Sequence, residues 1–186
     1  MSTYLQYSNS DNLKVGNTSL SVGCKKFTSF TGSLENTTAV ATAYGDNDVL
    51  VELGTLDISL PSNFDQTARK IVIEKIIVNV EVASGQALVG HISASATTGT
   101  ATNSEIAAPT ELFGAGATQL SPEGYGLATT ATEADIDFNS ANVTFCSPGI
   151  VINDPTIIHI YACTHTAINA DITAGRFNVM VEYTVV

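Results

Sequence analysis

The sequence predicts an all-β protein, an antiparallel β-sandwich with a long inserted loop. Apolar and polar side chains alternate along several segments, and a period of two is the period of a strand. β-Branched residues dominate these segments, and such residues pack well on a pleated sheet. Turn-forming residues and long connections separate the segments, which favours a sandwich or jelly roll over a meander barrel.

The composition favours a single domain that works inside an assembly. The chain has 186 residues, a common length for one β-sandwich. Charged residues make up only 13%, against about 25% in typical soluble domains. The 18 acidic and 7 basic residues give a net charge of -11. An acidic surface repels phosphate backbones and anionic lipids, so we expect neither nucleic acid nor a membrane as a partner.

Three widely spaced cysteines, Cys24, Cys146 and Cys163, are interpreted as reduced and buried, or as one disulfide with one cysteine left over. The first residues lack the basic and apolar segments of a signal peptide. No apolar run approaches the roughly 18 residues of a membrane-spanning helix. We therefore expect a protein that is made in a cytoplasm and stays soluble.

Residues 1–25 are predicted to form an N-terminal arm, followed by a sandwich domain over residues 26–186. The arm is polar and irregular, with Tyr4, Leu5 and Tyr7 as its early apolar cluster. Such a segment is either a loosely attached tail or an arm that crosses to a neighbouring subunit through its tyrosines.

The first strands of the domain are predicted over 37–44 and 49–60, with a turn between them. The phase of the apolar positions changes after Gly54, which is typical of a bulge or of a strand that bends between two sheets. The next strand, 69–82, is the predicted centre of the fold, covered on both sides near its start. Its predicted faces are Val72, Ile76, Val78, Val80 and Val82 on one side, and Ile71, Ile73 and Ile77 on the other.

Residues 87–96 are predicted to return as an antiparallel partner of this strand. The stretch 97–133 that follows is rich in Thr, Gly, Ala and Ser. Loops of this length inside a compact domain are usually functional or mobile, and the low charge argues against a solvated disordered tract. We expect this excursion to pack on a neighbouring protein or to shape a protruding tip. The residues expected at contacts with other proteins are Tyr4, Leu5, Tyr7, Leu112, Phe113 and Tyr125.

Regular strand patterns resume after the excursion. The predicted strands lie at 134–139, 143–145, 149–152, 156–164 and 176–185. The stretch 156–164 is apolar on both faces, which predicts an interior strand. In 176–185 every second residue from Phe177 to Val185 is predicted to face inward. We count about eight to ten strands and no helix.

His159, Tyr161, Cys163 and His165 alternate along one predicted strand and would share one face. Imidazole and thiolate are zinc ligands, but one strand supplies too few converging ligands, and nothing requires His91 to join them. We expect a half-buried face with hydrogen-bonded imidazoles and no metal.

Other chemistry is weakly represented in the sequence. Carboxylates two residues apart at 46–48 and 135–137 resemble calcium loops, yet they lack the glycine and the distal glutamate of an EF-hand. No nucleophile elbow and no phosphate-binding loop is present. We expect no enzyme activity, no catalytic residue and no cofactor.

Three stretches, RKIVIEKIIVNVEVASG, GHISASA and ITAGRFNVMVEYTVV, together resemble the small all-β virion proteins of tailed bacteriophages. The jelly-roll capsid decoration (cement) proteins are the most similar family, and the resemblance covers roughly residues 65–186. It implies a jelly-roll domain that binds the major capsid protein on the outside of the head, as a homotrimer that bridges capsid subunits. It also implies synthesis in the host cytoplasm and a place on the capsid exterior of the virion.

Other functions stay open. A receptor- or carbohydrate-binding head of a phage fibre should present exposed aromatic residues around a concave patch, and Tyr125 is the one hint of this. A jelly-roll capsid subunit would need an inward basic patch, for which Lys14, Lys25 and Lys26 stand near the N-terminus. A metal-dependent cupin enzyme would need a histidine cluster that the sequence lacks.

Overall fold

The computed structural model describes the backbone of most of the chain and the side chains of the sandwich core. The described residues are 5–7, 13–15, 18–20, 24–34, 44–45, 48–60, 70–100, 104–107, 109–112, 118–120, 136–139, 141, 143–147, 150–165 and 172–186. In 5–7, 13–15, 18–20, 118–120 and 143–147, and at Cys24, the backbone alone is described.

The described residues form strands and no helix. The strands are β1 (Leu5–Tyr7), β2 (Leu13–Val15), β3 (Thr18–Leu20), β4 (Cys24–Ser33), β5 (Val49–Thr55), β6 (Ile71–Val82), β7 (Val89–Ser95), β8 (Thr110–Glu111), β9 (Thr118–Leu120), β10 (Ile136–Asp137), β11 (Val143–Ser147), β12 (Ile150–Ile152), β13 (His159–Thr164) and β14 (Arg176–Val185).

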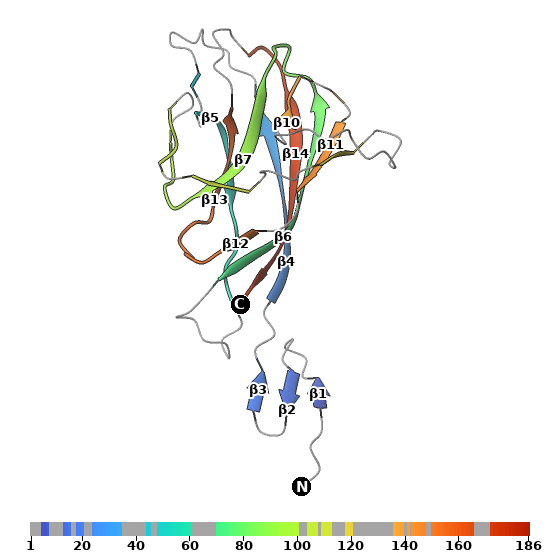
Figure 1. Ribbon diagram of the computed structural model, residues 1–186, viewed down its shortest axis with the longest axis vertical. Helices are drawn as coiled ribbons and strands as arrows, with labels where there is room; N and C mark the ends of the chain where they lie inside the picture. The colour runs from blue at the N-terminus through green and yellow to red at the C-terminus, as the bar shows by residue number, and fades with distance from the viewer. Residues whose placement is uncertain are drawn as a thin grey trace.

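Two antiparallel sheets make up the body of the molecule (Figure 1). The large sheet has six strands in the order β4-β14-β6-β11-β9, with β12 also paired to β6. The small sheet has five strands in the order β10-β7-β13-β5, with β8 also paired to β7. The prediction of an all-β antiparallel sandwich is therefore confirmed.

The core lies between the two sheets and follows the predicted alternation most closely in β14. Its inward side chains, from Phe177 to Val185 at every second position, are all 0–1% exposed. They meet Ile92 and Ile160 of the small sheet in one apolar cluster. The rings of Phe138 and Phe177 lie 4.9 Å apart across the core. Burial of such alternate side chains provides most of the driving force for folding.

The central strand β6 differs from its predicted pattern because it contains two β-bulges. Tyr183 pairs with Ile73 and Glu182 with Lys75, so Glu74 is an extra residue in β6. A second extra residue, Glu81, lies near the other end. Each insertion reverses the side that the following residues face.

The prediction of two covered faces in β6 is therefore wrong. Ile71 and Ile73 precede the first bulge, Ile76 and Val78 follow it, and all four side chains face the same core with 0% exposure. Val82 follows the second bulge and is 39% exposed, so it does not belong to the buried face.

The change of phase at Gly54 was predicted correctly. The pairing of β13 with β5 skips one residue just before Gly54, and beyond it Leu56 is buried. Gly54 has φ +148°, and a Cβ at this position would lie 2.8 Å from the Phe30 ring. The close approach of β4 therefore requires glycine here.

The described parts of the excursion 97–133 pack on the chain itself, and the rest of the stretch, where the expected contact with a neighbour or protruding tip would be tested, lies outside the described residues. β8 pairs with β7, β9 pairs with β11, and Asp48 and Glu105 form an isolated bridge. The predicted strand 37–44 lies outside the described residues except for the buried Tyr44. The expected arm contains a separate antiparallel sheet, β1-β2-β3, below the sandwich in Figure 1, so it is not wholly irregular.

Candidate interaction surface

The outward face of the large sheet carries four of the five large apolar side chains that are exposed among the described residues. We define this face by the side chains of β4, β14, β6 and β12 that point away from the core. Phe27 is 66% exposed, Val151 53%, Met180 49% and Val82 39%. No described segment lies over these residues. A group of large apolar side chains on one face is typical of a surface that contacts another protein.

A shallow hollow lies where β4 and β14 meet on this face. It is lined by Phe27, Thr28, Ser29 and Met180 and has a volume of about 240 Å³. The alternation of the two strands explains the hollow, because the small Ser29 lies opposite Met180 in the register. Larger side chains therefore stand around a position where a small one leaves space.

Charged side chains on the outward face balance each other. The three cations are Lys25, Lys75 and Arg176, and the three carboxylates are Glu74, Glu81 and Glu182. Three positive and three negative charges sum to zero, whereas the whole chain carries -11.

Ion pairs hold most of these charges. Lys25 Nζ lies 3.0 Å from Glu74 Oε2 and also contacts Glu182, and Arg176 Nε lies 2.7 Å from Glu81 Oε2. Hydrogen bonds to Glu182 and Glu74 raise the pKa of Lys25, so it stays charged. Such exposed pairs add little stability, but they fix the charge pattern of the face.

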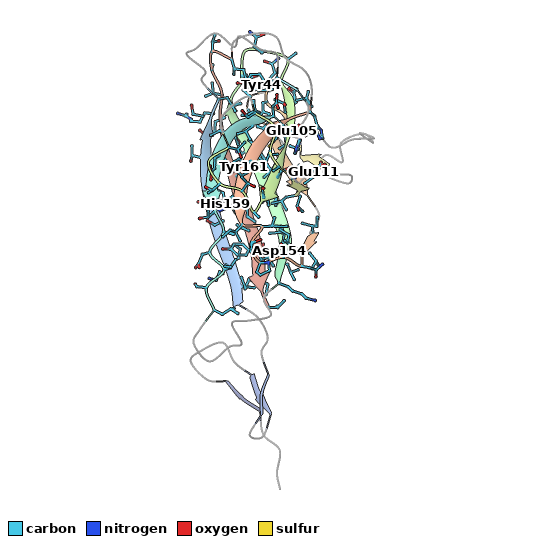
Figure 2. All side chains as sticks on the ribbon, turned by 90° about the vertical axis from the view of Figure 1, so that its left-hand side faces the viewer. Tyr44, Glu105, Glu111, Asp154, His159 and Tyr161 are labelled. Carbon is cyan, nitrogen blue, oxygen red and sulfur yellow. The ribbon has the colours of Figure 1, made fainter. Side chains whose placement is uncertain are left out.

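The opposite side of the molecule is acidic. Asp48, Glu52, Glu105 and Glu111 lie on or over the outer side of the small sheet, and no lysine or arginine is described there. Figure 2 shows Glu105 and Glu111 on this side. The sandwich therefore has one neutral, partly apolar face and one acidic face.

The histidine-containing strand lies under the acidic side. His159, Tyr161 and Cys163 share the outer side of β13, as predicted, and His159 and Tyr161 are labelled in Figure 2. Tyr161 and Cys163 are fully buried because Ile106 covers them and packs with them in a second small apolar cluster.

Glu52 of the neighbouring strand β5 holds the residues that follow β7, at the start of the segment that leads to Ile106. Its carboxylate accepts hydrogen bonds from Thr98 Oγ1 at 3.3 Å and from Gly99 N at 3.0 Å. The Tyr161 hydroxyl donates to the carbonyl oxygen of Thr97 at 2.7 Å. His159 Nδ1 lies 3.4 Å from Glu52 Oε1, a long distance for a hydrogen bond.

The expectation of a half-buried face is wrong at Tyr161 and Cys163, which are 0% exposed. His91, which pairs with Cys163 from β7, is also buried. Its side chain is 0% exposed, neither ring nitrogen has a hydrogen-bond partner, and its ring centroid lies 4.1 Å from that of His165. Burial, and secondarily the neighbouring His165, lowers the pKa of His91 to about 3. Burial, and secondarily Asp48, raises the pKa of Cys163 to about 12, so both groups are neutral.

The expectation for the cysteines can be checked at Cys163 alone, where the thiol is free and buried as predicted. Within the described residues, no three His, Cys, Asp or Glu side chains are arranged to hold a metal ion. The stretches 46–48 and 135–137, whose paired carboxylates only resemble calcium loops, lie in part outside those residues.

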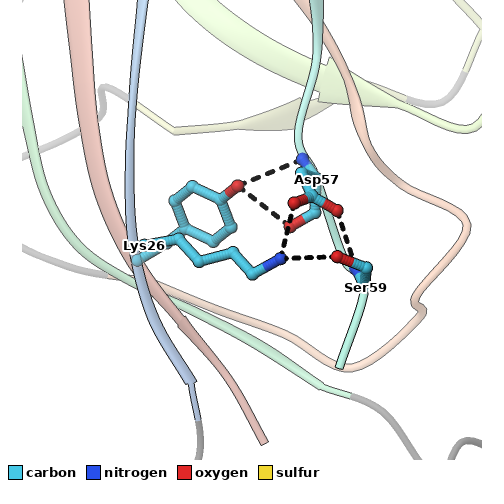
Figure 3. A network of polar contacts seen from close by, with 4 residues as sticks. Lys26, Asp57 and Ser59 are labelled. Carbon is cyan, nitrogen blue, oxygen red and sulfur yellow. Dashed lines mark hydrogen bonds and ion pairs between the residues drawn. The ribbon is translucent and has the colours of Figure 1, made fainter. Parts of the chain in front are cut away.

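A polar network ties the β4 edge of the large sheet to the segment after β5 (Figure 3). Lys26 Nζ donates to Asp57 Oδ2 at 2.7 Å and to Ser59 Oγ at 3.0 Å. The Tyr183 hydroxyl donates to the Asp57 carbonyl oxygen and accepts from the Asp57 N–H, both at 3.0 Å. The hydrogen bond from Lys26, followed by those from Ser59, holds the pKa of Asp57 well below its usual range.

Among the predicted interface residues, the structure describes the side chain of Leu112 alone. Leu112 is 2% exposed and packs in the core, so its expected place at an interface is wrong. Leu5 and Tyr7 lie in β1, whose side chains are not described. Tyr4, Phe113 and Tyr125 lie outside the described residues.

Phe27, Met180 and Val151 were missed by the sequence analysis. A weak indication was present, because Met180 interrupts the polar positions of β14 between Asn178 and Glu182.

Comparison of the chain with family models, with curated proteins and with solved structures gave no match. No helix in the described part of the chain has the length and apolar character needed to cross a membrane. A function has to be argued from the residues of the chain itself.

Proposed function

We propose that the chain is a structural virion protein, a capsid decoration protein that binds the outside of a phage head and stabilises the shell by bridging capsid subunits. The observation that carries this proposal is the two-sided surface. A neutral face with exposed apolar side chains suits contact with protein, because few charges must be desolvated there. The acidic side suits exposure to water.

The order of the strands supports a jelly roll, which is the fold that the resemblance implies. Eight strands form two facing groups of four, β4-β14-β6-β11 and β5-β13-β7-β10. Along the chain, β4, β5, β6 and β7 alternate between the two groups, and so do β10, β11, β13 and β14. Such an order arises when a long antiparallel hairpin is rolled up into two Greek keys. Viral capsid domains are among the proteins that use this fold, and so are lectins and cupins.

The stabilising effect would follow from mass action. A protein that binds the assembled shell and not its free subunits lowers the free energy of the assembled state by RT ln(1 + [L]/Kd). The contact needs no catalytic group. Val151 lies on the outward side of β12, across β6 from β14, and its side chain is 53% exposed, so it is well placed to meet a partner.

A jelly-roll capsid subunit is less well supported. Two of the cations that could face a genome, Lys25 and Lys26, are held by carboxylates of the same chain. A carbohydrate-binding head is also less well supported, because Phe27 is the one aromatic side chain among the described residues that is largely exposed.

The test is cosedimentation of the purified protein with shells that lack it. We expect the wild-type protein to pellet with the shells and Val151→Glu to lose most of this binding, because a new charge would be desolvated at the contact. Ala107→Glu, the same change of charge on the acidic side, is the matched control and should bind normally. Wild-type protein that stays in the supernatant but binds on a glycan array would refute the proposal in favour of a receptor-binding head.

A further inference from the structure

We propose that the β4 end of the outward face is a contact between two copies of this chain, related by a two-fold axis. This inference goes beyond the proposed function and does not depend on it, because it rests on the edge strand, the hollow and the local charges. The partner is a second copy of the same chain.

The edge strand β4 offers a long and unprotected backbone. It has ten residues, and its one described partner is β14. A strand of this length spans about 33 Å. Edge strands are usually protected against pairing by charged side chains or proline, and the stretch from Phe27 to Ser33 has neither.

The two lysines at the start of β4 do not protect it either. Lys25 is bound by Glu74 and Glu182 on the outward face, and Lys26 is bound by Asp57 toward the small sheet. Both cations are therefore neutralised within the chain.

Phe27 and the adjacent hollow supply the apolar part of the contact. The Phe27 ring is 66% exposed beside a hollow of about 240 Å³ that Met180 also lines. A cavity of about 150 Å³ is enough to hold benzene, so the hollow has room for an aromatic ring. In a two-fold contact the same patch is used on both subunits, so each copy provides a ring and a hollow.

The charges favour a second copy at this place. Two molecules of charge -11 repel each other, and the repulsion is strongest where their acidic sides meet. Around Phe27 the two lysines Lys25 and Lys75 balance Glu74 and Glu182, so like copies can approach here without net repulsion.

The geometry distinguishes this contact from the three-fold association that the resemblance implies. One patch that pairs with itself closes at two copies, whereas a ring of three needs two different patches on each subunit. The size of the particle in solution therefore decides between them.

The experiment is sedimentation equilibrium of the full chain over a range of concentrations. We expect a monomer–dimer equilibrium, and Phe27→Glu should raise the dimer dissociation constant at least about 30-fold because it places two like charges against each other. Val151→Glu is the matched control. It adds the same charge to the same face, but in β12, which β14 and β6 separate from β4, so it should leave the dimer intact.

Far-UV circular dichroism of both variants checks that the fold is retained. A wild-type monomer at every concentration, a trimer, or a dimer that Phe27→Glu does not weaken would each overturn the inference. Since Val151→Glu reports on shell binding and Phe27→Glu on self-association, the failure of one proposal is separable from the failure of the other.

Discussion

Mild acid should destabilise the sandwich through His91. The folded protein holds this imidazole neutral, with its pKa lowered from 6.5 to about 3 by burial and by His165. The unfolded chain has an ordinary histidine that takes up a proton as the pH falls through 6.5. Below that pH the unfolded state binds more protons than the folded state, so stability is present above pH 6.5 and falls with falling pH.

The size of the effect follows from the shift in pKa. One pH unit corresponds to about 1.4 kcal/mol of unfolding free energy for one titrating group. The unfolded histidine is already half protonated at pH 6.5, so between pH 6.5 and about 4.5 His91 should remove about 2 kcal/mol, and the loss levels off near pH 3 at about 5 kcal/mol. A typical domain has only about 5–15 kcal/mol of stability in total, so the loss is easily measured.

Urea denaturation followed by circular dichroism, repeated at several pH values, measures this loss. The window from pH 6.5 to 4.5 excludes Asp57, whose carboxyl titrates near 3.8 in the unfolded chain and lower in the folded protein. His91→Leu removes the titrating group and its two unpaired nitrogens, so it should flatten the pH dependence without lowering stability at neutral pH.

If the wild-type protein and His91→Leu lose stability in parallel as the pH falls, the burial of His91 is not the cause.

Two further substitutions test the packing. Leu112→Ala should lower the unfolding free energy by about 2–5 kcal/mol in urea denaturation, as expected for a core leucine; a change below about 0.5 kcal/mol would place it on the surface. Gly54→Ala should cost about 1–3 kcal/mol, because its Cβ would lie 2.8 Å from Phe30 at φ +148°. Gly99→Ala, at φ +69° with no atom within 4 Å of the added Cβ, should cost less and serves as the control for backbone strain alone.

The direction in which side chains face was predictable from the sequence where apolar and polar residues alternate regularly. The inward positions of β14 could be assigned because one strand without interruption shows its alternation directly. The change of phase in β5 could be assigned because Gly54 marks it. Leu112 could not, because an isolated leucine within a stretch of Thr, Gly and Ala has no period that shows which way it faces.

The interaction surface was harder to predict, since it consists of exceptions to the pattern. Phe27 stands among outward residues of β4, and Met180 does the same in β14. An exposed apolar residue is common on any protein, so a single one indicates little from sequence. Only the pairing of β4 with β14 shows that the two side chains line one hollow.

The bulges in β6 explain the wrong prediction of its buried face, and they also affect the charge pattern of its outward face. Glu74 and Glu81 are the two residues of β6 that have no pairing partner in β14. Glu74 binds Lys25 together with Glu182, and Glu81 binds Arg176. Without the first insertion, a strand with strict alternation would place Glu74 on the side opposite Lys75, Asn79 and Glu81. The same two residues that disguise the buried face of β6 in the sequence therefore neutralise the cations on its outward face. The balance of charge around Lys25 is in this sense a consequence of the first irregularity in the sheet.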